Sequence, residues 1–162
     1  MGPELPPAPS STLANIAVLS LAAMIGSETE LVPLLRCVPL FSELSEDDLA
    51  QVADVALPRS FAAGEVVFRE DDEGDTCYIV RSGQARAVRV HGDGRSLTLA
   101  HFRPGDIFGE LAMFEGELRS ATVDALEDTE LLAILAADMR RLIEQHPGLA
   151  VKLLVGLGRR LC

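Results

Sequence analysis

The stretch CYIVRSGQARAVRVH, residues 77–91, contains two runs of aliphatic and β-branched residues separated by the turn dipeptide Ser82-Gly83. Such runs between turn residues are typical of short β-strands. Similar runs recur between Leu57 and Leu135, and many short strands at regular spacing indicate a rolled or closed antiparallel sheet. The predicted strands are Glu65–Arg69, Cys77–Arg81, Ala85–His91, Ser96–Phe102, Ala121–Ala125 and Leu131–Leu135.

Helical periodicity flanks this strand-rich region on both sides. Before it, Glu28–Ala56 carries leucines at helical spacing, and Ser45 followed by three acidic residues is a good N-cap. After it, the helical period returns from Ala136 and is interrupted at His146-Pro147 before a second helix. The sequence therefore predicts an α+β fold. Its centre is an antiparallel, jelly-roll-like β-roll, flanked by N-terminal helices and a C-terminal helix pair.

The 162 residues suit one compact domain with a short extension. Residues 1–29 are expected to form a disordered lead-in and a short apolar helix, Leu13–Gly26. That segment is too short for a bilayer span of about 20 residues, and it lacks a basic leader because the first Arg is Arg36. It could pack on its own domain, bind a partner or add a dimer contact. Residues 30–162 are expected to form the domain, with the roll at 57–135 and the C-terminal helices at 136–162.

The formal net charge of −11, with a single Lys, disfavours binding to nucleic acid or anionic lipid. The three Cys residues are far apart and odd in number, which is typical of reduced thiols in a cytoplasmic protein. The three His residues form no cluster, and Asp71-Asp72-Glu73 is interpreted as a solvated turn. We therefore expect neither a metal site nor enzymatic activity.

One constellation of residues points to chemistry. It is Phe108-Gly109-Glu110-Leu111-Ala112-Met113, then five residues, then Arg119-Ser120-Ala121-Thr122-Val123. Glycine allows close approach of the backbone, and the unpaired amides of a short helix favour an anion. An arginine offers a planar fork to two phosphate oxygens, while a serine adds a hydroxyl and a glutamate can accept from a sugar hydroxyl. Together these groups indicate a ribose-phosphate site.

This segment resembles the phosphate-binding cassette of the cyclic nucleotide-binding domain family, which includes the catabolite activator protein and cAMP-dependent kinase regulatory subunits. The resemblance covers roughly residues 30 to 162. Beyond the cassette it includes Val38-Pro39-Leu40-Phe41-Ser42, the Glu73-Gly74-Asp75 turn with the strand after it, and Pro104-Gly105-Asp106.

The resemblance implies a role for each matching residue. Arg119 would pair with the cyclic phosphate and Ser120 would support it, while Glu110 would hold the ribose 2′-hydroxyl. Serine rather than threonine at position 120 favours cAMP over cGMP as the ligand, and no cofactor is expected. Amides of the cassette would surround the ligand and apolar residues of the preceding strand would line the base pocket; these are Gly109, Leu111, Ala112, Leu99 and Phe102.

The implied function is that of a regulatory sensor that changes conformation when it binds the nucleotide. In transcription factors of this kind the final helix runs on to a helix-turn-helix, whereas this chain ends at Cys162. We therefore expect no direct DNA binding by this chain, and a homodimer through the C-terminal helix. The alternatives are the sensor half of a Crp/Fnr-type regulator without its helix-turn-helix, a regulatory domain of an enzyme or transporter, and a degenerate roll used only for dimerisation.

Overall fold

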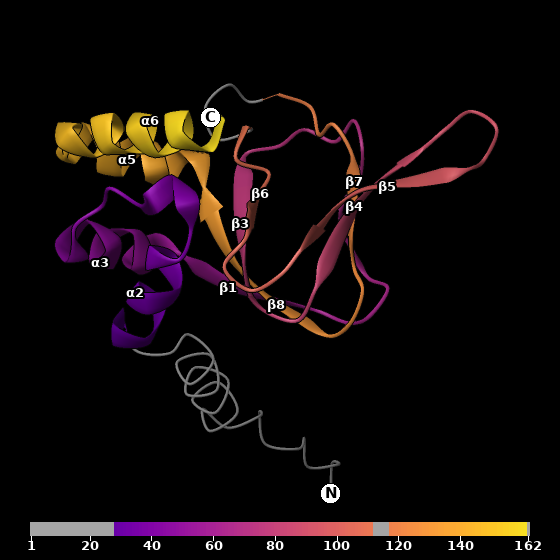
Figure 1. The fold of residues 1–162 in the computed structure, drawn as a ribbon, viewed down its shortest axis with the longest axis horizontal. Coiled ribbons are helices and arrows are strands. Elements are labelled where there is room, and N and C mark those ends of the chain that lie inside the picture. The colour runs from indigo at the N-terminus through magenta and orange to yellow at the C-terminus, as the bar shows by residue number, and fades with distance from the viewer. Residues whose placement is uncertain (1–27, 112–116, 162) are drawn as a thin grey trace, which may run out of the picture.

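The computed structural model describes residues 28–111 and 117–161. The predicted lead-in and apolar helix lie outside these ranges up to residue 27, as do Ala112, Met113 and Cys162. The described backbone forms two four-stranded sheets that curl into a roll, with helices gathered at one end of it (Figure 1). The prediction of an α+β fold built on an antiparallel β-roll is confirmed.

The N-terminal helices are α2 (Glu28–Arg36), the 3₁₀ turn η1 (Pro39–Phe41) and α3 (Glu46–Val55). A capping box starts α3 at Ser45, the residue predicted to be the N-cap. The Ser45 hydroxyl accepts a hydrogen bond from the Asp48 amide at 3.2 Å, and the Asp48 carboxylate accepts one from the Ser45 amide at 3.0 Å. Both bonds satisfy amides that a helix start leaves unpaired.

The strands pair antiparallel in the orders β1-β8-β3-β6 and β2-β7-β4-β5. At the far end of the roll from the helices, the β4–β5 hairpin projects outward (Figure 1). The strand bounds are β1 Leu57–Phe61, β2 Val66–Phe68, β3 Thr76–Ser82, β4 Ala85–Val90, β5 Ser96–Phe102, β6 Ile107–Phe108, β7 Thr122–Ala125 and β8 Thr129–Leu135.

Two of these strands were not predicted. β1 contains Pro58, which lacks an amide donor, and the strand is tolerated because it lies at a sheet edge and pairs on one side only, with β8. β6 has only two residues and pairs with Tyr78 and Ile79 of β3. Neither segment is long or regular enough to show a two-residue period in the sequence.

The core has two parts. One packs the helices against β3 and β8, with Phe41, Leu49 and Ile134 fully buried. The other fills the roll interior with small and aliphatic side chains, such as Ala87 and Val123, against aromatic rings. The helix at the chain's end thus shares a core with the N-terminal helices, while the roll interior keeps a core of its own.

The C-terminal pair is α5 (Ala136–Gln145) and α6 (Pro147–Leu161), and α6 begins at the predicted proline. Lys152 of α6 pairs with Asp48 of α3 at 2.5 Å, and Arg159 pairs with Glu43. Among the described helices, none has both the length and the apolar character that a bilayer crossing requires.

Candidate functional site

The end of β6 and the start of β7 bring the two halves of the cassette together. After Phe108 the chain turns at Gly109, whose φ of +74° is a left-handed conformation that favours glycine. A Cβ at this position would lie 2.6 Å from Arg119 Nη1 and 3.2 Å from the Thr76 carbonyl oxygen. Gly109 is therefore required both by its backbone conformation and by the close approach of Arg119.

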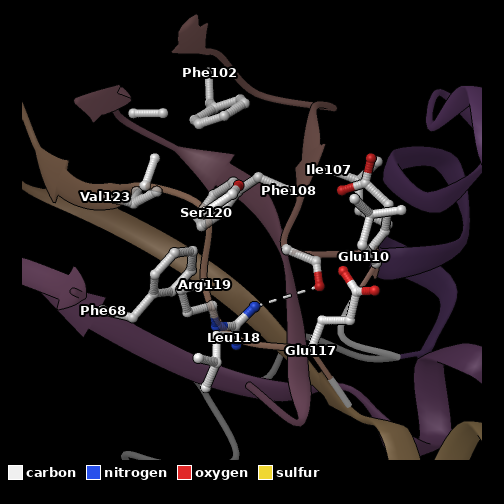
Figure 2. A pocket seen from close by; sticks show the side chains of 14 residues that line it. Phe68, Phe102, Ile107, Phe108, Glu110, Glu117, Leu118, Arg119, Ser120 and Val123 are labelled. Atoms are coloured by element: carbon white, nitrogen blue, oxygen red, sulfur yellow. Dashed lines mark hydrogen bonds between the residues drawn. The ribbon is translucent and has the colours of Figure 1, made fainter. Parts of the chain in front are cut away.

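Arg119 is the buried charged side chain of the described residues, with 6 % of its surface exposed. Its Nη2 donates to the Thr76 carbonyl at 2.6 Å. Its Nη1 donates to the Gly109 carbonyl at 3.4 Å (Figure 2). The guanidinium also lies over the ring of Phe68, 4.0 Å from the ring centroid. It points into the roll rather than into solvent.

The charge of this guanidinium is only partly compensated. No ion pair joins Arg119 to a carboxylate within residues 28–111 and 117–161, and its Nε is buried without a hydrogen-bond partner there. Burial lowers the pKa of Arg119 from its ordinary value, although nearby Tyr78 and Asp75 act in the opposite direction. A buried cation that retains an unused donor favours an anionic ligand, because such a ligand would supply the missing charge and acceptors.

Main-chain hydrogen bonds hold Arg119 in place. Its amide donates to the Asp72 carbonyl at 2.8 Å, and its carbonyl accepts from the Asp71 amide at 2.8 Å. Leu118 and Glu73 form an isolated antiparallel bridge beside them. Asp71 has a φ of +69°, which forms the tight turn that presents these groups. The backbone of the acidic turn Asp71-Asp72-Glu73 therefore fixes the position of the Leu118-Arg119 backbone.

A cavity of about 260 Å³ lies beside this arginine. Its size is close to the lower end of the range, roughly 300–1,000 Å³, that is typical of small-ligand pockets. Phe102 and Phe108 stack with ring centroids 4.7 Å apart and form one wall, while Phe68 and Arg119 lie at another side (Figure 2). Charged, polar and aromatic groups thus line one cavity.

Most of the residues predicted for the site line this single cavity. They are Gly109, Glu110, Leu111, Arg119, Ser120 and Phe102. Ala112 lies outside the described residues. The structure also adds residues that the sequence analysis did not single out for the site, among them Phe68, Ala87, Ile107, Ala121 and Val123.

The placement of Leu99 differs from the prediction. Its side chain is 48 % exposed, and it is not among the residues that line the cavity. The β4–β5 pairing explains this, because Ala87 pairs with Ala100 and the next residue, Val88, pairs with Thr98. Leu99 is therefore the extra residue of a β-bulge, and a bulge residue leaves the regular alternation of faces.

Cys77 of β3 belongs to the core that the helices share with β3 and β8, and its thiol is unreactive. Its side chain is fully buried, and its pKa is raised to about 12, chiefly by burial and then by the negative charge of Glu110. The thiol is therefore protonated at neutral pH and lacks the thiolate that a nucleophile or metal ligand requires.

Comparison with known proteins agrees with this geometry. The cyclic nucleotide-binding domain family matches residues 58–146, more than half of the chain. The chain belongs to this family. It is similar to the cyclic AMP receptor protein of Thermus thermophilus, with 37 % identity over 123 residues, and to a putative potassium channel protein of Rhodopseudomonas palustris, with 37 % identity over 117 residues.

These matches cover 76 % and 72 % of this chain but only 57 % and 28 % of the two relatives. The chain thus spans little more than half of the first relative and about a quarter of the second. Among solved structures, the N-terminal domain of a transcriptional regulator from Streptomyces coelicolor aligns with a TM-score of 0.75 and 34 % identity. That alignment covers 79 % of this chain and 90 % of that domain.

Proposed function

We propose that this domain binds cAMP in the cavity beside Arg119 and acts as a ligand-gated regulatory module. The observation that carries the proposal is the buried guanidinium, which has an unused Nε donor and no carboxylate partner within the described residues. A cyclic phosphate would supply both the charge and the acceptors that this group lacks.

Each residue of the cassette has a part in the proposal. Arg119 pairs with the cyclic phosphate, Ser120 adds a hydroxyl or amide donor, and Glu110 accepts from the ribose 2′-hydroxyl. The amides of Gly109 and Leu111, and that of Ala112 outside the described residues, surround the phosphate. Phe102 contacts the base, because aromatic rings offer a flat apolar surface to a purine.

The choice of cAMP over cGMP rests on two supports. Position 120, directly after the arginine, is a serine, whereas a threonine at this position is associated with guanine recognition in some relatives. The Thermus relative is named as a cyclic AMP receptor. We therefore expect cGMP to be the weaker ligand.

A second, largely apolar cavity offers a route from the ligand to the helices. It has a volume of about 460 Å³ and shares Leu111 and Glu117 with the first cavity. Its remaining walls come from α5 and α6, including Ile143 and Leu157. A ligand that repositions Leu111 would change the packing of α6. It can shift this equilibrium only by its differential affinity for the two arrangements.

The proposal includes a setting for the domain: a cytoplasmic homodimer that associates through α6, performs no catalysis and does not itself contact DNA. Cys37 and Cys77 are both free thiols, which agrees with a reducing compartment. The likeness to the Streptomyces domain favours a second candidate, the sensor half of a transcription regulator.

Isothermal titration calorimetry tests the proposed ligand. The wild-type domain is titrated with cAMP, cGMP and 5′-AMP, and Arg119→Ala and Arg119→Lys are titrated with cAMP. Hydrogen bonds to charged groups are worth about 1.5–3 kcal/mol each, so losing a bidentate pair should weaken binding on the order of a hundredfold or more. Lysine keeps the charge but not the planar fork, so its affinity should be intermediate.

Arg86→Gln is the control for this titration, because Arg86 forms an ion pair with Asp124 and does not line the cavity. This variant should bind cAMP as the wild type does. Unchanged cAMP affinity in a folded Arg119→Ala variant would refute the assignment of the site. The absence of binding by the wild type to either cyclic nucleotide would support the degenerate-roll alternative instead.

A further inference from the structure

We propose that Arg89 is a positioning residue for this site: it fixes the Ser120 main chain, so that Arg119 and Ser120 face the cavity. The inference rests on the proposed function and names a residue outside the cassette. Arg89 Nη2 donates to the Ser120 carbonyl at 2.7 Å, and Arg89 Nε pairs with the Glu70 carboxylate at 3.2 Å. One guanidinium thus joins β4, the segment after β2 and the cassette.

The position of this contact matters because the regular β4–β7 pairing ends just before it. The final pair is Val88 with Thr122, and β7 begins at Thr122, so Ser120 lies beyond the strand. Arg89 follows Val88 directly and bonds the Ser120 carbonyl with its side chain. The Arg89 side chain therefore attaches Ser120 to β4 at a point beyond the last backbone-paired residues of the two strands.

The direction of the Ser120 carbonyl has an electrostatic consequence. A carbonyl oxygen that turned toward a bound phosphate would repel it and would displace a donor from the site. Arg89 is not among the residues that line the cavity, so the carbonyl that it holds is directed to a group outside the cavity. The interaction leaves the Ser120 hydroxyl and the neighbouring Arg119 guanidinium to serve the ligand.

Glu70 completes the arrangement. Its carboxylate pairs with Arg89, and its own amide donates to the Thr122 hydroxyl at 3.0 Å. The carboxylate limits the rotamers of Arg89, whose side chain is 46 % exposed. A lysine at this position has a single ammonium group and cannot present the same planar fork to a carboxylate and a carbonyl.

The same strand offers a matched control. Arg86 also lies on β4, is 38 % exposed and forms an ion pair at 2.9 Å, but its partner is Asp124 within β7. Arg86→Gln and Arg89→Gln each remove one charge and one partly exposed ion pair. They differ in that only Arg89 contacts the cassette.

The experiment titrates cAMP into the wild type, Arg89→Gln, Arg89→Lys and Arg86→Gln, with urea unfolding of each variant in parallel. Arg89→Gln should bind cAMP about tenfold more weakly, since one partly exposed hydrogen bond to a charged group is lost. Arg89→Lys should recover part of that loss, while Arg86→Gln should stay within about twofold of the wild type. If Arg89→Gln does not fold, Arg89→Lys carries the comparison.

The outcomes separate the two proposals. Wild-type affinity in Arg89→Gln overturns the positioning role and leaves cAMP binding intact. Equal weakening in Arg89→Gln and Arg86→Gln also overturns it, because the loss then follows general destabilisation of β4. Failure of the wild type to bind cAMP overturns both proposals. Weakening confined to Arg89 variants, with unfolding free energies close to that of Arg86→Gln, supports the inference.

Discussion

At the scale of single residues, Gly109 combines two requirements that can be separated by mutation. Its φ is +74°, and an added Cβ would meet Arg119 Nη1 at 2.6 Å. Gly94, in the β4–β5 hairpin, has a similar φ of +82° but has no atom within 4 Å of an added Cβ. Substitution of either glycine would therefore strain the backbone. Only substitution of Gly109 would also cause a collision with the Arg119 side chain.

We predict that Gly109→Ala and Gly94→Ala each lose about 1 kcal/mol or more of unfolding free energy from the left-handed backbone. Only Gly109→Ala should also lose cAMP affinity, because its methyl group displaces the Arg119 guanidinium. Chemical denaturation and calorimetric titration measure the two effects. Equal cAMP affinity in the two alanine variants would contradict the close approach of Gly109 and Arg119.

The sequence selected Gly109, Glu110 and Arg119, which line the cavity, because glycine, glutamate and arginine each have distinctive conformational or hydrogen-bonding properties. Phe68 and Leu99 could not be placed in the same way. Phe68 reaches the cavity through pairing with Val123 on β7, and that register is not encoded locally. Leu99 lies away from the cavity because it is the extra residue of a β-bulge, which a two-residue alternation in the sequence does not reveal.

At the scale of elements, the contact of α6 with η1 depends on Gly156. A Cβ on this residue would collide with the backbone carbonyl of Leu40, whereas one on Gly158 of the same helix would meet nothing within 4 Å. Alanine is favoured over glycine by about 1 kcal/mol inside a helix, and less near its end. Substitution at the two positions should therefore have opposite effects.

We predict that Gly158→Ala raises the unfolding free energy by up to about 1 kcal/mol, while Gly156→Ala lowers it by about 1–3 kcal/mol through overpacking. Urea denaturation with a common m-value measures both effects. Stabilisation by Gly156→Ala would mean that α6 does not rest on η1 as the structure describes.

The elements themselves were predictable to the extent that they are long or capped. The Ser45 cap and the start of α6 at Pro147 follow from residue types with strong positional preferences. β1 and β6 escaped prediction because a proline-containing edge strand and a two-residue strand are stabilised by their partners, β8 and β3. These two strands form because of pairing with residues distant in the sequence, which local sequence patterns do not encode.

At the scale of the whole molecule, α6 leaves an apolar stripe uncovered. Val151, Leu154 and Val155 are 62 %, 67 % and 43 % exposed, and their spacing of three and four residues places them on one face of the helix. Burial of this stripe against a second copy would remove apolar surface from water. A two-fold axis would make the same stripe serve both partners.

We predict that the domain forms a dimer in sedimentation velocity experiments and that Leu154→Glu shifts it to the monomer, because two carboxylates would then meet in an apolar interface. Leu97→Glu is the control: Leu97 is also an exposed leucine, 52 % accessible, but it lies on the projecting β4–β5 hairpin. It should leave the dimer intact. A wild-type monomer at high protein concentration, or dissociation by Leu97→Glu instead of Leu154→Glu, would exclude α6 as the interface.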